Sequence, residues 1–305
     1  MATVLSLIQQ FCYRSNLPAP STVVGVTSPA ELQYLSLFKF IGDNLRNRPF
    51  NWPQLKRTYE FNTQTDVRNY QMAGDFYRLL ESTPWDQSNQ WPMRGPISDY
   101  NFQIRSLAIV SLQTRKAFRI FGPSGYLYNT SPYSQRSAGY FEIDPAGQND
   151  TDTLQFEYVS ANWCWPRDWV TATAYTAGDI RSGVANLYIA TSSGTSGATR
   201  PNWTSGSGSD GTVTWKVYTE PYVISNDSDF CLFDDDLIIE GMRWAYLDAK
   251  GLEPAQASQK RQDWEMMVRS AMGRTNGPTR INAADEFGDQ WGPWPYTPPG
   301  GWDVT

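Results

Sequence analysis

Three adjacent carboxylates, Asp234, Asp235 and Asp236, are side chains that could hold a divalent cation. They stand directly before the amphipathic segment LIIEGMRWAYLDAKG, and acids at the start of a helix cap its free N–H groups and offset its dipole. The chain has no histidine and no second acidic cluster at a ligand spacing. We therefore predict a helix cap at these residues, with no bound metal and no cofactor.

Catalytic motifs are equally scarce. The chain has no phosphate-binding glycine loop, nucleophile elbow, kinase motif set or zinc-protease motif, and its run GSGSDG is typical of a hairpin turn. Glycoside hydrolysis needs only two carboxylates, and the chain has 31 acidic residues, but nothing marks a particular pair. We predict that the protein is not an enzyme.

The three cysteines, Cys12, Cys164 and Cys231, form no C-x-x-C pair, so we expect reduced, buried side chains. Cys164 and Cys231 flank a distinctive segment and could lie on neighbouring strands, which leaves a disulfide between them as the alternative. The N-terminus lacks the pattern of a signal peptide, and no apolar run is long enough to span a membrane. These features predict a soluble, non-secreted protein without a membrane partner.

The charge distribution argues against sequence-specific DNA binding. The net charge is −6, and the 25 Lys and Arg residues are spread along the chain without a basic run. Sequence-specific DNA-binding proteins usually carry a basic stripe. A mildly acidic wall that repels DNA remains possible, although ordinary solubility explains this charge equally well.

Apolar periodicity predicts helices near both ends of the chain. The first has a stripe from Val4 to Cys12 and ends near Ser15. The second begins with a capping box, in which Ser28 is the cap and Glu31 stands three residues later, and it ends near Asn47. Its expected buried face consists of Leu32, Leu35, Phe38, Ile41 and Leu45.

Two more helices are expected toward the C-terminus. One follows the three aspartates, buries Ile238, Met242, Ala245 and Ala249, and ends at Gly251. The other begins at Pro254 and ends at Gly273. Its expected buried side consists of Trp264, Met267, Val268 and Ala271.

The middle of the chain has the pattern of antiparallel β structure. Short alternating stretches such as LKRTYEF and LQFEYVS are separated by Pro, Gly and Asn turns, with a short helix expected near 98–108. The loop between them carries Trp85 and Trp91, which are too bulky and apolar to be idle. Packing under that loop and an intersubunit contact are both open for these two rings.

Residues 166–220 differ in composition from both flanks. The stretch is rich in Gly, Ser, Thr and aromatics, whereas FEYVSANWC before it and SDFCLFDDD after it have the composition of one larger domain. We therefore predict an α+β fold: a helical bundle made of the N-terminal helix pair and the C-terminal helices, an antiparallel β domain, a small all-β inserted module and an extended C-terminal arm. The predicted division is 1–165 with 221–272 as core domain, 166–220 as insert and 273–305 as arm.

The arm is rich in Pro and Gly, which leaves little regular structure, yet it carries large aromatic side chains. Such anchors on an extended chain predict docking along a partner surface, with wrapping on the protein's own domain as the alternative. The candidate anchors are Phe287, Trp291, Trp294, Tyr296 and Trp302.

In their order, the segments outside the insert resemble the head-to-tail adaptor proteins of tailed bacteriophages, of the neck or tail-tubular kind. Besides the N-terminal helical pair, the segments that carry this resemblance are WPQLKRTY (52–59), GDFYR (74–78), WPMRGP (91–96), FEYVSANWC (156–164) and LIIEGMRW (237–244). Each is weak alone, and their order is what counts. The aromatic arm is a departure, so its partner cannot be carried over from the family.

The resemblance implies a structural virion protein, assembled in the host cytoplasm and located at the neck or tail vertex. Its copies would form a homo-oligomeric ring of twelve below the portal protein, extend the channel through which DNA passes without sequence-specific contact, and meet the next tail or nozzle component. In such rings the C-terminal arm commonly reaches the portal.

The insert resembles a second family, the small chitin- and cellulose-binding modules. The match begins at AYTAGDI (174–180), continues through NLYIA (186–190) and TSGATRPNW (195–203), and ends at GTVTW (211–215). In that family exposed rings stack on sugars, which makes Tyr175, Tyr188, Trp203 and Trp215 the candidate glycan-stacking residues. A module this small also needs aromatics for its own core, so a purely structural role is the alternative.

Three functions follow from these patterns. The first is the adaptor ring. The second is a receptor- or glycan-binding adhesin of the tail, with residues 174–215 as the binding module, and the third is a hydrolase of cell-wall sugar. An adhesin usually places its binder at a terminus or tip, whereas this module interrupts a domain that resumes afterwards, which favours the adaptor.

Overall fold

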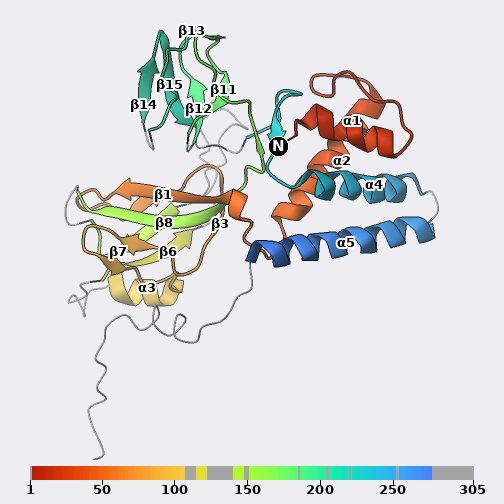
Figure 1. Cartoon of the computed structure of the whole chain (residues 1–305). Helices are drawn as coiled ribbons and strands as arrows, with labels where there is room; N and C mark the ends of the chain where they lie inside the picture. The colour runs from red at the N-terminus through yellow and green to blue at the C-terminus, as the bar shows by residue number, and fades with distance from the viewer. Residues whose placement is uncertain are drawn as a thin grey trace, which may run out of the picture.

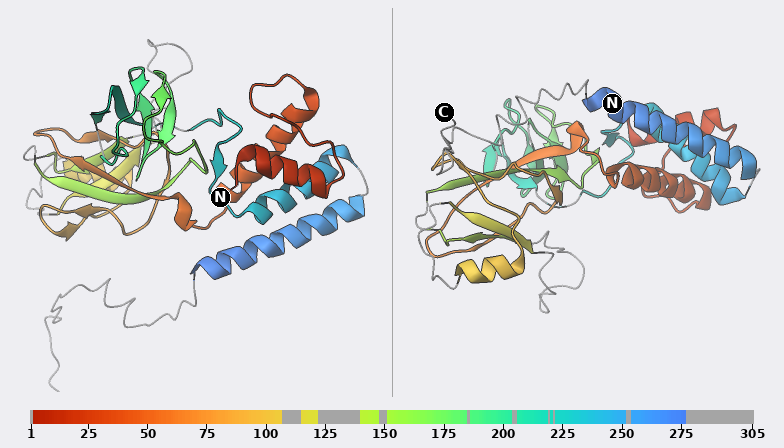
Figure 2. Two further views of the ribbon diagram at one scale, coloured as in Figure 1. Left: turned by 45° about the horizontal axis from the view of Figure 1, so that its top comes forward. Right: turned by 90° about the horizontal axis from the view of Figure 1, so that it is seen from below.

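The chain is an α+β protein in the computed structural model. The structure describes residues 2–106, 115–121, 140–147, 151–184, 186–203, 206–218, 220, 222–251 and 254–276. Within these residues there are five α-helices and several antiparallel sheets. Figures 1 and 2 show the helices from the two ends of the chain gathered at one end of the molecule, a β sandwich with a short helix of its own at the other end, and a smaller β unit beside the sandwich. The α+β class predicted from the sequence is confirmed.

Helices from both ends of the chain share one hydrophobic core. They are α1 (Val4–Arg14), α2 (Pro29–Arg46), α4 (Asp235–Lys250) and α5 (Pro254–Asn276). Helix α4 lies in the middle and packs against the other three. The apolar stripe predicted for α1 is buried from Val4 to Cys12, and the Thr3 hydroxyl accepts the Ser6 N–H at its start. Leu17, in the loop between α1 and α2, packs against the same core.

Helix α2 has the predicted bounds but a different start. Ser28 stands at the cap position without a side-chain hydrogen bond, so the predicted capping box is wrong. Pro29 follows it and has no N–H, and the Ser28 carbonyl accepts the Leu32 N–H at 3.0 Å, so the backbone alone holds the first turn. Phe38, Ile41 and Leu45 are buried as predicted. Leu32 is exposed and Leu35 is half-buried, whereas Tyr34 and Leu37 are buried in their place, so the predicted face is wrong at Leu32.

Helix α4 begins as the three aspartates predict. The Asp234 carboxylate accepts the Asp236 N–H at 3.0 Å, and the helix ends at Gly251, whose φ of 63° needs glycine. Arg14 of α1 forms ion pairs with Asp236 and Glu240, at 2.9 and 3.2 Å.

Two predictions for the C-terminal helices need correction. Ala249 is exposed at the end of α4, and α5 continues past Gly273 to Asn276. Trp264, Val268 and Ala271 are buried as predicted, whereas Met267 is only partly buried. The predicted arm beyond Asn276 lies outside the described residues.

The middle of the chain forms a two-sheet sandwich with short helical additions. One sheet has the order β1-β8-β4-β5 with β3 also on β8, and the other has the order β2-β7-β6. Their bounds are Lys56–Asn62 (β1), Asn69–Gln71 (β2), Phe76–Leu79 (β3), Trp85–Asp86 (β4), Trp91–Pro92 (β5), Ala117–Phe121 (β6), Tyr140–Asp144 (β7) and Thr153–Ser160 (β8). The 3-10 turn η1 (Pro53–Leu55) precedes β1, and α3 (Asp99–Ser106) lies against β6 and β7. All strand pairs are antiparallel.

Aromatic rings fill the space between the two sheets. Phe141 of β7 stacks on Phe118 of β6 at 4.7 Å and on Phe156 of β8 at 5.1 Å. Alternate residues of β8 point to this core, which is why LQFEYVS has the alternating pattern seen in the sequence.

The inserted segment folds around a core of its own. Its strands are Ala174–Tyr175 (β10), Ile180–Ser182 (β11), Leu187–Ala190 (β12), Gly194–Thr195 (β13), Ser207–Asp210 (β14) and Val213–Tyr218 (β15). They form a four-stranded sheet, β11-β12-β15-β14, and a small pair, β10-β13. We call residues 166–220 the module from here on.

The chain enters and leaves the module through two segments that pair with each other, and we call residues 161–165 and 220–231 the stalk. Strand β9 (Cys164–Trp165) lies antiparallel to β16 (Phe230–Cys231), as the sequence suggested for Cys164 and Cys231. The Asn162 side chain donates to the Glu220 carbonyl and accepts the Tyr222 N–H. These contacts close the core domain across the insertion point.

Trp163 fixes the stalk to helix α2. Its indole N–H donates to Asp43 at 3.0 Å, and its ring lies over Gly42, where a Cβ atom would overlap the six-membered ring. The absence of a side chain at Gly42 therefore makes room for Trp163.

Gly42→Ala should lower the free energy of unfolding by about 1–3 kcal/mol, because the added methyl group forces Trp163 or α2 to move. Chemical denaturation monitored by circular dichroism measures this loss.

The matched control is Gly273→Ala in α5, where nothing lies within 4 Å of the added Cβ. This change should stabilise the helix by about 0.5–1 kcal/mol. Equal effects of the two substitutions would show that Trp163 is not held by close packing on Gly42.

Candidate interaction surfaces

The two tryptophans of the predicted contact loop lie on one short hairpin, β4–β5. Trp85 is opposite Pro92, and Asp86 is opposite Trp91; β4 also pairs with β8 at Leu154 and Gln155. Because neighbouring residues of a strand alternate between faces, the two indoles leave opposite faces of the hairpin. Trp85 is 41 % exposed and Trp91 is 38 % exposed.

A buried ion triad holds this hairpin in place. The ammonium group of Lys116, just before β6, bonds to the Asp86 carboxylate and to Asp152 at 2.9 Å. All three side chains are almost completely buried. Asp86 also accepts both the backbone N–H and the side-chain amide of Asn89, which closes the turn between Trp85 and Trp91.

The charge state of Lys116 follows from these contacts. Burial lowers the pKa of Lys116, but its hydrogen bonds to Asp86 and Asp152 outweigh burial, so the pKa of Lys116 is raised. The lysine therefore stays charged at neutral pH and compensates two buried carboxylates. Removal of the cation would leave both carboxylates buried beside each other.

A second cation lies on the hairpin surface. The guanidinium of Arg115 is 5.4 Å from the centre of the Trp91 ring, within the range of a cation–π contact. Trp91 with Arg115 beside it, and Trp85 on the opposite face of the same hairpin, are partly exposed on a fixed backbone, and aromatic and arginine side chains of this kind are enriched at protein interfaces. This surface is a candidate protein contact, and the intersubunit role stays a prediction.

Three of the four candidate glycan-stacking rings are buried in the module. Tyr175 and Trp215 are in edge contact at 5.0 Å, Tyr188 packs on Trp203 at 5.4 Å, and Tyr175, Tyr188 and Trp215 are at most 5 % exposed. The Tyr188 hydroxyl donates to the Trp203 carbonyl at 2.7 Å. Rings without a free face cannot stack on a sugar, so the stacking prediction is wrong for these three, and the alternative of a core role holds.

Trp203 is the one half-buried ring of the four. It lies against Gly208 of β14, where a Cβ atom would be 3.0 Å from the ring, and it covers the end of the small core. A single partly covered ring offers much less to a glycan than the row of four expected from the sequence.

The proposed anchors of the arm, Phe287, Trp291, Trp294, Tyr296 and Trp302, lie outside the described residues.

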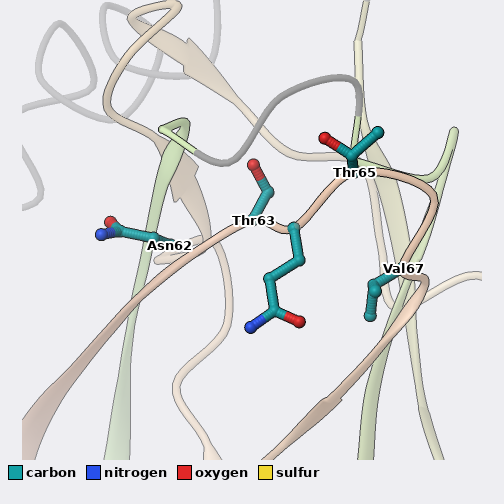
Figure 3. Close-up of a pocket in the computed structure, with 5 residues that line it drawn as sticks. Asn62, Thr63, Thr65 and Val67 are labelled. Carbon is teal, nitrogen blue, oxygen red and sulfur yellow. The ribbon is translucent and has the colours of Figure 1, made fainter.

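Two hollows lie on the described surface, and their linings differ in chemistry. One, of about 490 Å³, lies along the loop after β1 (Figure 3) and is lined by Asn62, Thr63, Gln64, Thr65 and Val67, none of which titrates. Among the described residues no group of three or more acidic or cysteine side chains could hold a metal ion, and no helix is long and apolar enough to cross a membrane.

A second hollow, of about 220 Å³, lies where α2 meets the stalk. It is lined by Lys39, Asp43, Arg46, Ala161, Asn162, Trp163, Cys164, Tyr222, Val223 and Ile224. The sequence did not predict this site or the triad of Asp86, Lys116 and Asp152, because their members are far apart along the chain. The sequence offered one signal for the triad: Asp86, Lys116 and Asp152 are charged residues within or next to apolar β segments.

Neither a known protein-family model nor a curated protein matches this chain.

Lys116→Met should lower the free energy of unfolding by about 3–5 kcal/mol, because it leaves two buried carboxylates without their cation. Denaturant unfolding monitored by circular dichroism measures the loss. Lys56→Met on the exposed start of β1 is the control and should change stability by less than about 0.5 kcal/mol. A loss below about 1 kcal/mol for Lys116→Met would contradict a supporting role of the triad.

Proposed function

We propose that this protein is a structural, non-enzymatic head-to-tail adaptor of a tailed bacteriophage, whose copies form a ring between the portal and the tail. The ring extends the channel for DNA, and the chain's partners are further copies of itself, the portal and the next tail component. The proposal rests on the sequence resemblance and on how the resembling segments are arranged.

One observation carries the proposal. Of the segments that resemble the adaptors, 156–164 contains most of β8 and the start of β9, and β8 pairs directly with β1 of segment 52–59 and β3 of segment 74–78. The hairpin of segment 91–96 joins β8 through β4. Segments between residues 52 and 164 thus meet on one strand, which supports the proposal that they form a single framework.

The two ends of the molecule offer different faces for a ring. The Trp85–Trp91 hairpin joins β8 at Leu154 and Gln155, whereas Val159 at the other end of β8 belongs to the helical core. On the helical side, Leu32 and Phe40 of α2 are about half exposed. A ring needs one face of each copy to meet a different face of the next copy. We assign the hairpin and this α2 stripe to those two faces.

The module takes no part in this assignment. It has its own core and joins the core domain only through the stalk in sequence. The burial of Tyr175, Tyr188 and Trp215 removes most of the support for the adhesin alternative.

The direct test is the position and copy number of the protein in purified particles, by quantitative mass spectrometry and electron microscopy. We expect about a dozen copies at the tail-bearing vertex. A few copies at a distal tail tip, or hundreds over the capsid, would overturn the adaptor proposal, and the tip location would favour the adhesin.

Replacement of both Trp85 and Trp91 by Ala should weaken ring assembly at least about 30-fold, because the loss of even one interface anchor of this type costs about 2 kcal/mol. Mass photometry and electron microscopy of the protein co-expressed with the portal measure assembly. Tyr100→Ala on α3, which removes a more exposed ring, is the control and should assemble normally. Normal assembly of a folded double variant would exclude the hairpin as a ring contact.

A further inference from the structure

Cys164 and Cys231 stand directly opposite each other on β9 and β16. The Leu232 N–H donates to the Trp163 carbonyl at 3.0 Å, so the pair of residues 163 and 232 carries the ladder hydrogen bond. The Cys231 N–H instead points away from β9, to the Ala2 carbonyl. The two cysteines therefore form a non-hydrogen-bonded pair, in which the Cα atoms of antiparallel strands lie about 4.5 Å apart.

This spacing suits a disulfide. Disulfide-linked residues have Cα atoms about 4.4–6.8 Å apart, with Cβ atoms directed toward each other, as in a directly opposed pair on one face of a strand pair. Both thiols are free in the structure, and both are buried. Cys12 is also a free, buried cysteine, but it lies on α1 and has no cysteine opposite it.

One of the two cysteines lies beside a hollow at the surface of the described residues. Cys164 lines the 220 Å³ hollow between α2 and the stalk, together with Val223, which is exposed. Burial raises the pKa of Cys164 and raises that of Cys231 to about 12. Since the thiolate is the reactive form, exchange through this hollow is slow at neutral pH and faster as the pH rises.

The two cysteines also flank the module in the sequence. The module lies between Cys164 and Cys231, so a bond between them would close the whole insertion into a covalent loop. The present closure consists of non-covalent contacts: the β9–β16 pair, the bonds of Asn162 to Glu220 and Tyr222, and the contact of Arg167 with Ser228.

We propose that Cys164 and Cys231 are a reversible modification site, which a low-molecular-weight disulfide converts into a cross-strand disulfide that locks the stalk of the module. The Cys164 thiolate attacks one sulfur of the small disulfide and releases the first small thiol, which leaves a mixed disulfide on Cys164. The Cys231 thiolate then attacks the Cys164 sulfur and releases the second small thiol. In total, the two protein thiols lose two protons and two electrons. The small disulfide takes up these protons and electrons and becomes two small thiols.

The test is oxidation of the folded full-length chain with hydroxyethyl disulfide at pH 8.5, followed by thiol counting and peptide mapping without reduction. We expect two of the three thiols to disappear, a single Cys164–Cys231 linked peptide pair, and a return to three thiols with dithiothreitol. The oxidised protein should have a higher melting temperature, and trypsin should cleave more slowly after Arg167, which lies in the module next to the stalk and contacts Ser228.

Controls separate this site from general oxidation. Cys12→Ser should form the same link, whereas Cys231→Ala should retain the Cys164 thiol or stop at the mixed disulfide. Because the unsubstituted chain is mapped directly, a variant that fails to fold does not affect the result. Three outcomes would overturn the proposal. Two are a disulfide that involves Cys12 and a disulfide between molecules. The third is a folded chain that keeps three free thiols under conditions that oxidise the urea-unfolded chain.

Discussion

The placement of the Trp163 indole is the contact on which the arrangement of the three parts depends. The ring packs on Phe38 at 5.3 Å and on Phe233 at 6.2 Å, over the bare backbone of Gly42, and its N–H donates to Asp43. Trp163 belongs to the segment that leaves β8 and enters β9. One side chain thus fixes the end of the sandwich and the start of the stalk against the helices, and burial of so large a ring is among the strongest apolar contributions a residue can make.

Ionisable side chains with hydrogen-bond partners support the sandwich at two separate points. The triad of Lys116 with Asp86 and Asp152 holds the tryptophan hairpin, and Asp75 holds the bulge between β3 and β8. Burial raises the pKa of Asp75, while the hydroxyls of Tyr158 and Ser160 donate to it at 2.7 and 2.6 Å. Buried charges are costly to desolvate, so they add little net stability. Their value here is positional, because a shifted strand would leave a charge without its partners.

Local patterns predicted the parts of the fold that depend on local periodicity. The stripe from Val4 to Cys12 and the aspartates before α4 specify their helices because the relevant contacts lie within a few residues of each other. The predicted capping box failed because Ser28 has the residue type and position of an N-cap, yet its side chain forms no cap hydrogen bond. The triad was missed because Asp86, Lys116 and Asp152 meet only after strands far apart in sequence pair. The stacking roles predicted for Tyr175, Tyr188 and Trp215 failed for a related reason, because the sequence alone does not distinguish an aromatic residue on a surface from one in a small core.

The stalk explains how the core domain tolerates a module of this size. Backbone groups at an insertion point normally lose their partners when a strand is interrupted, and buried groups without partners are costly. Here the two segments at the insertion point supply hydrogen bonds to each other. Strand β9 pairs with β16, and the Asn162 side chain donates to the Glu220 carbonyl and accepts the Tyr222 N–H. Thr3 adds a further bridge to Phe230, and Val4 donates to the Asp229 carbonyl, so the N-terminus covers the other edge of β16. Among the described residues, the hydrogen bonds at the insertion point are therefore made within the stalk, and the module packs around its own buried rings Tyr175, Tyr188 and Trp215.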